Sequence, residues 1–172
     1  ILAFAWKCEA KKGLKFTREE FVRGMTKLRC TTLDDLKKQV EALRSEPYAS
    51  RESFTSFFKA SFVLSCDEFE KTLGELRGVR RVGALLTSAL AAGEVASMLL
   101  TMVVKEPSEF PHLSSLTEFL STRRRVSLDE WGQIPVFERT VAPDCSDFDE
   151  DGAWPLLFDD FVEWFKETAS KK

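Results

Sequence analysis

Residues 147–164, DFDEDGAWPLLFDDFVEW, begin with the spacing of a calcium-binding loop and continue with the pattern of an amphipathic helix. Asp147, Asp149 and Asp151 stand at alternate positions and Gly152 follows, as in the first half of an EF-hand loop. The twelfth position of such a loop supplies a bidentate Glu, but here it is Phe158. The stretch therefore lacks its key ligand, and calcium binding becomes the weaker of two explanations for its acidity.

The remaining periodic segments also predict helices, because apolar residues recur at spacings of three and four and no strand pattern of useful length appears. Thr17–Glu20 (TREE) and Ser127–Glu130 (SLDE) have the form of capping boxes, which begin helices. One helix is expected to open after Thr32 and to stop before Pro47, since a residue ahead of proline avoids the α region. Pro135 is expected to break or kink the helix that follows Ser127. The fold class is all-α, with two helix–loop–helix units.

Two apolar segments supply much of the expected core. The helix that begins at Ser50 carries four rings at helical spacing, which favour core packing over a ligand site: Phe54, Phe57, Phe58 and Phe62. Asp67–Arg77 predicts a further helix that ends at Gly78. Val82–Val104 is long enough to span a bilayer, but its one charge, Glu94, lies at its middle, where a carboxylate is costly in lipid. A buried helix pair is therefore expected there instead of a membrane span.

Composition narrows the class of protein. The chain has 172 residues and a net charge of −3, whereas a nucleic-acid-binding protein is usually basic. Its four widely spaced cysteines, with no secretory signal, are typical of reduced thiols in the cytoplasm or nucleus. The sequence starts at Ile1 within an amphipathic pattern, so we expect it to be a fragment that lacks its natural N-terminal part.

Most catalytic classes lack their sequence signatures. The chain has no phosphate-binding glycine loop, no G-x-S-x-G motif and no clustered metal ligands, so neither a metal nor a cofactor is expected. The single histidine, His112, is expected in a surface or capping role. The basic run Arg123–Arg125 favours a solvated helix end over a phosphate or nucleic-acid site. An enzyme that uses one of the thiols remains a rival hypothesis, and the candidates are Cys8, Cys30, Cys66 and Cys145.

The acidic C-terminal segment is the strongest functional signal in the residues themselves. Between Asp144 and Glu163 there are eight carboxylates and neither Lys nor Arg. A solvated loop and helix face would explain such a charge, but Trp154 and other apolar residues in the segment should fix it in place. A rigid surface of one sign orients a basic partner, and the small side chain of Ala153 would let that partner approach closely. Partner docking is therefore the preferred interpretation, and a calcium-sensing module is the alternative.

Three stretches together resemble the defective-in-cullin-neddylation family, whose shared region is the potentiating-neddylation domain. They are ILAFAWKCEA, FTREEFVRGMTKLRC and the C-terminal acidic stretch, in which Asp149–Glu163 carries the most specific pattern. The resemblance covers residues 1–172 as one domain. The N-terminal signature is matched by Phe16, Glu20, Phe21, Gly24, Met25, Leu28 and Cys30.

This resemblance implies an all-helical fold with two degenerate EF-hand-like units that bind no calcium. It also implies a monomeric co-ligase without catalytic residues, acting in the cytoplasm or nucleus. Such a scaffold holds the C-terminal winged-helix subdomain of a cullin and the acetylated N-terminus of the neddylation-conjugating enzyme. Transfer of the ubiquitin-like modifier to the cullin then accelerates because the reactants are held in the right geometry. No membrane or nucleic-acid partner is implied.

By motif position, the resemblance places the cullin-binding patch on Asp129, Ala153 and Asp159. It places the pocket for the conjugating enzyme on five aliphatic positions, for which plain core packing is an equal alternative: Ile1, Leu14, Leu64, Leu99 and Met102. The family often has aromatic residues at two of these, Leu64 and Leu99.

Three features depart from the family pattern. The connection Cys66–Gly93 is longer than usual, Pro135 interrupts a helix that is usually continuous, and Arg29 replaces a glycine that commonly precedes the matching cysteine.

Overall fold

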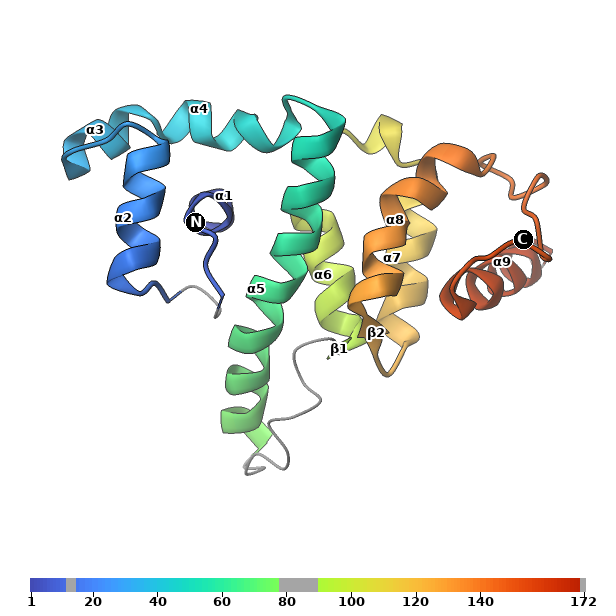
Figure 1. The fold of residues 1–172 in the computed structure, drawn as a ribbon. Helices are drawn as coiled ribbons and strands as arrows, with labels where there is room; N and C mark the ends of the chain where they lie inside the picture. The colour runs from blue at the N-terminus through green and yellow to red at the C-terminus, as the bar shows by residue number, and fades with distance from the viewer. Residues whose placement is uncertain (12–14, 78–89, 171–172) are drawn as a thin grey trace. The chain divides into compact units, whose positions relative to one another are not determined.

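The chain divides into two compact units, Ile1–Ser88 and Ala89–Lys172. The computed structural model describes residues 1–11, 15–77 and 90–170, with side chains described except in 66–77 and 90–91. These residues are mainly helical, which confirms the all-α fold class (Figure 1). That residues 1–172 form one domain stays a prediction. The first unit contains α1 (Leu2–Lys7), α2 (Arg18–Lys27), α3 (Leu33–Lys38), α4 (Val40–Ser45), a 3₁₀ turn (Glu46–Tyr48) and α5 (Arg51–Arg77).

Helix starts follow the local chemistry of the sequence. The hydroxyl of Thr17 accepts a hydrogen bond from the backbone N–H of Glu20, whose carboxylate accepts one from the N–H of Thr17 in return. The same reciprocal pair joins Ser127 and Glu130 at the start of α8. Both predicted capping boxes are confirmed, and each satisfies two backbone donors that a helix start leaves free.

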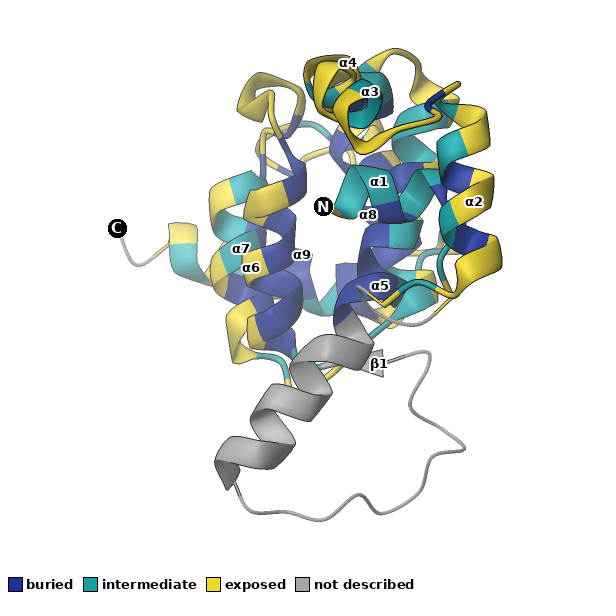
Figure 2. Cartoon of the chain, turned by 90° about the vertical axis from the view of Figure 1, so that its left-hand side faces the viewer, coloured by how far each residue is buried: buried dark blue, intermediate teal, exposed yellow. Residues whose placement is uncertain are grey.

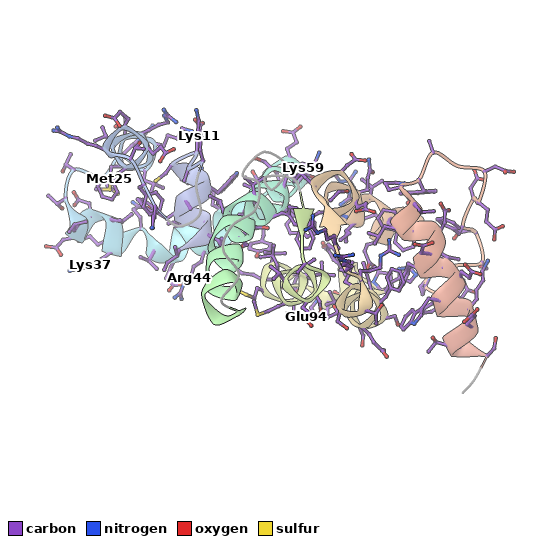
Figure 3. All side chains as sticks on the ribbon, turned by 90° about the horizontal axis from the view of Figure 1, so that it is seen from below. Lys11, Met25, Lys37, Arg44, Lys59 and Glu94 are labelled. Carbon is purple, nitrogen blue, oxygen red and sulfur yellow. The ribbon has the colours of Figure 1, made fainter. Side chains whose placement is uncertain are left out.

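Two predicted helix boundaries in the first unit differ from the structure. The segment after Thr32 forms two short helices, α3 and α4, because the N–H of Gln39 is shared between the carbonyls of Asp35 and Leu36 and tightens the turn between them. Lys37 of α3 and Arg44 of α4 are exposed (Figure 3). The two helices expected from Ser50 to Arg77 are instead one continuous helix, α5.

The first unit packs α1 against α2, α4 and α5. The indole Nε1 of Trp6 donates to the hydroxyl of Ser56 at 3.0 Å, and its ring lies 5.9 Å from that of Phe57. Phe57, Phe58 and Phe62 of α5 are at most 5% exposed. These three members of the phenylalanine stripe are therefore core, as the helical spacing predicted, and the fourth, Phe54, is half-buried.

Arg29 ends α2 in a left-handed backbone conformation, with φ of 53°. Its N–H donates to the carbonyl of Thr26, and the N–H of Cys30 donates to that of Met25, at 3.0 and 2.9 Å. These two bonds define a Schellman motif, whose left-handed residue is usually glycine. The family's preference for glycine at this position thus has a backbone reason, and Arg29 adopts the same conformation at a steric cost.

The second unit contains β1 (Leu90–Ala91), α6 (Gly93–Val103), a 3₁₀ turn (Pro107–Glu109), α7 (Leu113–Thr122), β2 (Val126–Ser127), α8 (Leu128–Thr140) and α9 (Leu156–Ala169). β1 and β2 pair antiparallel, with Leu90 opposite Ser127. α7 and α8 form a helix–loop–helix whose loop includes β2, at the end where β1 lies (Figure 1). The EF-hand-like character of the two units stays a prediction.

α6 and α7 lie side by side, and their buried residues gather on one side of each helix (Figure 2). Their approach depends on Gly93, because a Cβ at that position would lie 2.1 Å from the carbonyl oxygen of Leu120. No helix within the described residues is both long and apolar enough to cross a membrane. Gly78 and residues 82–89, to which the sequence assigned a helix end and part of a buried helix pair, lie outside the described residues.

Pro135 does not break α8, so the predicted break is wrong, while the alternative, a kink, stays a prediction. The helix runs from Leu128 to Thr140 with Pro135 buried inside it. Proline in a helix interior costs about 3 kcal/mol, because it removes one hydrogen bond and crowds the preceding turn. Trp131, Ile134 and Phe137, all 0% exposed, flank it on the buried face. Full burial of each such side chain contributes about 1.5–3 kcal/mol to the free energy of unfolding. The combined burial of the three therefore exceeds the cost of proline inside the helix.

Replacing Arg29 with glycine should stabilise the protein. Removal of the left-handed strain, about 1–2 kcal/mol, outweighs the greater entropy of an unfolded glycine, about 0.5–1 kcal/mol. We expect Arg29→Gly to raise the free energy of unfolding by about 0.5–1 kcal/mol in urea denaturation. Val22→Gly, at an exposed position inside α2, is the matched control and should lower it by about 0.5 kcal/mol. Destabilisation by both variants would contradict this account.

Candidate functional site

The interior of the second unit centres on the ring of Phe137 in α8. It stacks on Phe158 of α9 with ring centroids 4.6 Å apart and planes 17° from parallel. Phe148 and Trp154, from the loop between α8 and α9, lie 6.0 and 5.8 Å away. The ring of His112, at the start of α7, is 5.2 Å away. This aromatic cluster attaches the middle and the C-terminal end of the acidic loop, residues 141–155, to the core.

The carboxylates of the acidic loop bond to its own backbone. Asp147 accepts from the N–H of Ala142 at 2.7 Å, and Asp149 accepts from the N–H of Asp151 at 3.1 Å. Hydrogen bonds from the hydroxyl and N–H of Ser146 lower the pKa of Asp144. The loop position that would carry a bidentate Glu is Phe158, which is 0% exposed. These contacts hold the loop in place through backbone bonds and aromatic packing.

His112 joins the start of α7 to the end of α8 and to the acidic loop. Its Nδ1 faces Glu138 Oε2 at 3.2 Å, and its Nε2 faces the carbonyl oxygen of Ala142 at 2.9 Å. An imidazolium, which carries hydrogen on both ring nitrogens, can donate to both of these acceptors. Glu138 also accepts from the backbone N–H of His112 at 2.9 Å. The surface role expected for His112 is wrong, because the residue is 1% exposed. His112 does occupy the N-cap position of α7, but its side chain forms no capping hydrogen bond.

The pKa of His112 reflects this buried ion pair. Burial of the ring opposes its charge, but hydrogen bonds with Cys145 and Glu138 outweigh burial and raise the pKa of His112 to about 10. Among the described residues, Glu138 Oε1 has no hydrogen-bond partner, so the proton on His112 provides the main compensation for the buried carboxylate. Sequence reasoning missed this pair, because 26 residues separate its members and no short motif connects them.

The three residues of the predicted cullin-binding patch all lie in the second unit. Asp129 is exposed in the first turn of α8, and Ala153 is exposed at the end of the acidic loop. Asp159 is half-buried in the first turns of α9. Neither aspartate forms an ion pair within the part of the chain that the structure describes.

Arg123 links the end of α7 to α9, the helix that bears Asp159. Its guanidinium pairs with the carboxylate of Asp160 on α9 and lies over the ring of Phe119 at 5.5 Å. Arg123 ends α7, five residues before α8 begins at Leu128. The ion pair therefore joins the first half of α9 to the end of α7, whereas Asp129 lies in the first turn of α8.

The charge of the acidic segment is smaller than its sequence suggests. Asp160 is paired with Arg123, and Glu150 lies 3.3 Å from the ammonium of Lys166. Both cations, Arg123 and Lys166, lie outside the stretch Asp144–Glu163, so counting the charged residues within that stretch could not reveal them. The Arg123–Arg125 run is thus partly engaged in the structure, although Arg124 and Arg125 are exposed.

The predicted pocket residues divide between the two units. In the first unit, Ile1 is 84% exposed and Leu64 is 2% exposed, while Leu14 lies outside the described residues. In the second unit, Leu99 is 3% exposed and Met102 is 60% exposed, both on α6. The assignment of these five residues to one pocket stays a prediction.

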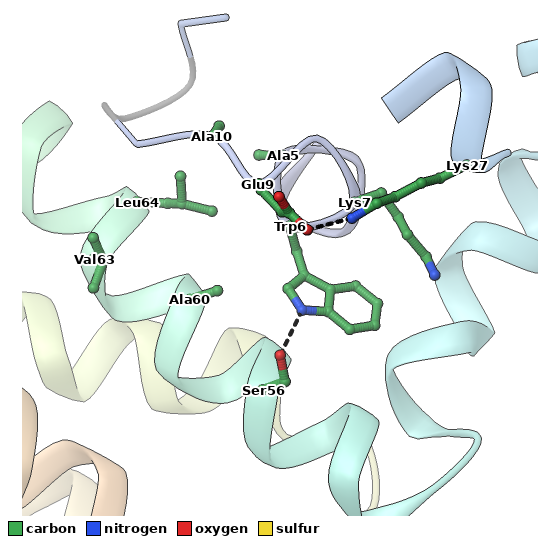
Figure 4. Close-up of a pocket in the computed structure, with 10 residues that line it drawn as sticks. All are labelled: Ala5, Trp6, Lys7, Glu9, Ala10, Lys27, Ser56, Ala60, Val63 and Leu64. Carbon is green, nitrogen blue, oxygen red and sulfur yellow. Dashed lines mark hydrogen bonds and ion pairs between the residues drawn. The ribbon is translucent and has the colours of Figure 1, made fainter. Parts of the chain in front are cut away.

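Leu64 lines a cavity of about 500 Å³ between α1 and α5 of the first unit (Figure 4). Trp6, Ala10, Ala60 and Val63 contribute apolar surface to it. Charged side chains from α1, the following residues and α2 also line the cavity, and Lys27 pairs there with Glu9. The cavity could accommodate a short apolar group with a polar end.

The thiols do not form an exposed nucleophile among the described side chains. Cys145 Sγ lies 3.5 Å from His112 Nε2, but Cys145 is 1% exposed, so a protein-sized substrate cannot reach it. Burial, followed by the charge of Glu20, raises the pKa of Cys8 to about 11, which disfavours the reactive thiolate. Cys30 is also buried, and the side chain of Cys66 lies outside the described ones. The described residues contain no group of three or more His, Cys, Asp or Glu that could hold a metal ion.

Comparison with known proteins gives consistent matches. A family model described as cullin binding matches residues 35–164, more than half of the chain. The chain is 32% identical over 168 residues to DCN1-like protein 5 of Homo sapiens, a match that covers 96% of this chain and 62% of that protein. It is 30% identical over 167 residues to DCN1-like protein 4 of Homo sapiens, covering 97% of this chain and 51% of that protein. The chain is also 31% identical over 169 residues to DCN1-like protein 2 of Dictyostelium discoideum, a match that covers 97% of this chain and 56% of that protein.

The His112–Glu138 pair predicts how stability depends on pH. The pKa of His112 is higher in the folded protein than the ordinary value of about 6.5, so the folded state binds more protons between these values. Its contribution is fully present below about pH 6.5 and is lost as the pH rises through about 10. We expect a loss on the order of 2–4 kcal/mol across this range, measured by urea denaturation. His112→Gln should lack this decrease, and parallel pH profiles for the two proteins would contradict the ion pair.

Calcium should not bind the acidic loop. Asp147 and Asp149 each accept a hydrogen bond from a backbone N–H, and the twelfth position counted from Asp147 is the buried Phe158 of α9. Isothermal titration calorimetry up to about 1 mM calcium, the range of weak extracellular sites, should show no saturable heat. A saturable signal that Asp149→Asn removes would contradict this prediction and restore the calcium-sensing alternative.

Proposed function

The chain belongs to the cullin-binding family that the DCN1-like proteins represent, and on this premise we propose that it is a scaffold that promotes cullin neddylation. It binds the C-terminal winged-helix subdomain of a cullin on the patch formed by Asp129, Ala153 and Asp159. It holds the acetylated N-terminus of the neddylation-conjugating enzyme at a second site. The modifier then reaches a cullin lysine faster, because both reactants are held near each other in one orientation.

The observation that carries this proposal is a rigid acidic surface whose key carboxylates are available. Asp129 and Asp159 form no ion pair within the described residues, whereas the adjacent Asp160 is paired with Arg123. Phe148 and Trp154 attach the loop that bears Ala153 to the core. A preorganised negative surface loses little entropy on binding and orients Lys or Arg side chains by charge-assisted hydrogen bonds.

The small side chain of Ala153 supports the same role. It is exposed between two flanking acidic positions, Asp151 and Asp159. A methyl group there keeps the surface flat, so that a basic side chain or backbone segment of the cullin can approach both carboxylates.

For the conjugating enzyme, we propose the cavity of the first unit that Leu64 lines. Its apolar lining suits a methionine side chain, and its polar rim suits the amide of an acetyl group. This part of the proposal rests on the family relationship more than on charge. It is tested by comparing the affinities of this chain for an N-terminal peptide of the conjugating enzyme with and without acetylation.

The scaffold has no active site of its own in this proposal. The buried positions of Cys8, Cys30 and Cys145 support this view, because none offers an accessible thiolate. A purified reaction should accordingly yield no thioester between the modifier and this chain. The decisive assay reconstitutes modification of a cullin C-terminal domain and compares the initial rate with and without the chain.

Ala153→Arg should remove cullin binding without unfolding the protein. A positive charge in the patch repels the basic surface of the cullin, and like-charge contacts at an interface cost several kcal/mol. We expect the affinity in calorimetry to fall by at least about 30-fold, or about 2 kcal/mol, and rate stimulation to fall with it. Circular dichroism should be unchanged, because Ala153 is exposed.

Ala169→Arg is the matched control, since Ala169 is exposed at the far end of α9. It introduces the same charge outside the patch and should keep wild-type affinity to within about twofold. Equal affinities for Ala153→Arg and wild type would show that the cullin binds elsewhere.

A further inference from the structure

Leu156, the first residue of α9, is 67% exposed, whereas the next two residues, Leu157 and Phe158, are 0% exposed. A single exposed leucine is common on protein surfaces and by itself carries no meaning. Its position is informative, because it lies between Ala153 and Asp159, two residues of the proposed cullin-binding patch. An exposed apolar side chain therefore stands, along the chain, between two residues of the proposed patch.

Helix geometry puts Leu156 and the acidic residues of α9 on one face. Residues three and seven positions apart share a face of an α-helix, so Leu156 aligns with Asp159 and Glu163. The opposite face is buried and carries the core residues Leu157, Phe158, Phe161 and Val162. A partner that contacts both Ala153 and Asp159 consequently covers Leu156 as well.

The backbone at Leu156 is held in place before any partner arrives. The ring of Trp154 lies 5.5 Å from that of Phe158, which in turn stacks on Phe137. Leu156 lies between these two fixed residues, so binding orders only its own side chain. Preorganisation of this kind lets apolar burial contribute to affinity with little entropic loss.

We propose that Leu156 is the apolar centre of the cullin-binding surface and that it takes an aliphatic or aromatic side chain of the cullin flanked by basic residues. This inference rests on the proposed function and deepens it. An interface with an apolar centre and a charged rim is typical of specific protein complexes, in which the buried centre contributes much of the affinity. The carboxylates of Asp129 and Asp159 form the rim and orient the basic residues of the partner.

The two kinds of contact differ in their dependence on salt and in their kinetics. Screening by salt weakens the rim contacts of Asp159 but leaves burial of Leu156 almost unchanged. Rim charges act mainly on the association rate, and loss of a buried apolar contact acts mainly on the dissociation rate. Salt dependence and kinetics therefore distinguish loss of the apolar contact of Leu156 from a loss of charge contacts on the acidic surface.

The test measures binding of the full chain to a purified cullin C-terminal subdomain by surface plasmon resonance at several salt concentrations. Leu156→Ser and Leu156→Gln should each bind about tenfold more weakly at every salt concentration, through faster dissociation. Leu156→Met, which stays apolar, should bind to within about twofold of wild type. Asp159→Asn should instead reduce the dependence of affinity on salt. Thermal denaturation of each variant verifies folding, which an exposed position should leave intact.

Leu33→Ser is the matched control, because Leu33 is 63% exposed on α3 of the first unit and lies outside the patch. It should leave cullin affinity unchanged. If Leu156→Ser and Leu156→Gln bind like wild type while Ala153→Arg does not bind, the inference about Leu156 is wrong and the proposed function stands. If Ala153→Arg also binds like wild type, the proposed cullin-binding patch is wrong as well.

Discussion

The stacking of Phe137 on Phe158 is the contact on which the second unit depends. It joins α8 to α9, and the rings of Phe148 and Trp154 attach the intervening loop to the same two residues. Aromatic pairs of this geometry contribute about 0.5–1.5 kcal/mol beyond the apolar area that they bury. The cluster also accounts for the continuity of α8, since the helix must pass Pro135 in order to present Phe137 to the interior. Acidic residues that would repel one another in a mobile loop are thereby held at fixed positions on the surface.

Fixed positions also allow individual carboxylates to be distinguished by their partners. Arg123 neutralises Asp160, Lys166 lies beside Glu150, and Asp129 and Asp159 form no ion pair within the described residues. Exposed pairs such as Glu150–Lys166 contribute little to stability, but they change the surface charge that a partner meets. The segment that looks uniformly acidic in sequence thus presents a selected set of negative charges. A cullin with matching basic residues would be oriented by that set and not by net charge alone.

Sequence reasoning succeeded where the determining chemistry is local. The capping boxes at Thr17 and Ser127 involve residues three positions apart, so their function could be inferred from spacing. It failed where residues far apart in sequence meet: nothing near His112 indicates Glu138, and nothing in the basic run indicates which arginine would pair with Asp160. It failed at Pro135 for a related reason, since local preference is outweighed by tertiary packing that the sequence does not display. The patch residues could be named only through the family pattern, because exposed aspartates and alanines carry no signal of their own.

Phe158 stands where a calcium-binding loop has its metal-coordinating Glu, and this difference changes which interactions order the conformation of the loop. In a calcium-sensing helix–loop–helix, the ion orders the carboxylates, and the exposed surface therefore depends on calcium concentration. Here the twelfth position packs into the core, and a backbone N–H donates to one oxygen of Asp147 and to one of Asp149. The ordering free energy is supplied during folding by aromatic burial and by the His112–Glu138 pair, so the surface is present whenever the unit is folded. Under the proposed scaffold function, this arrangement would let the affinity for a cullin depend on the charges and apolar contacts of the two surfaces and not on an activating ion.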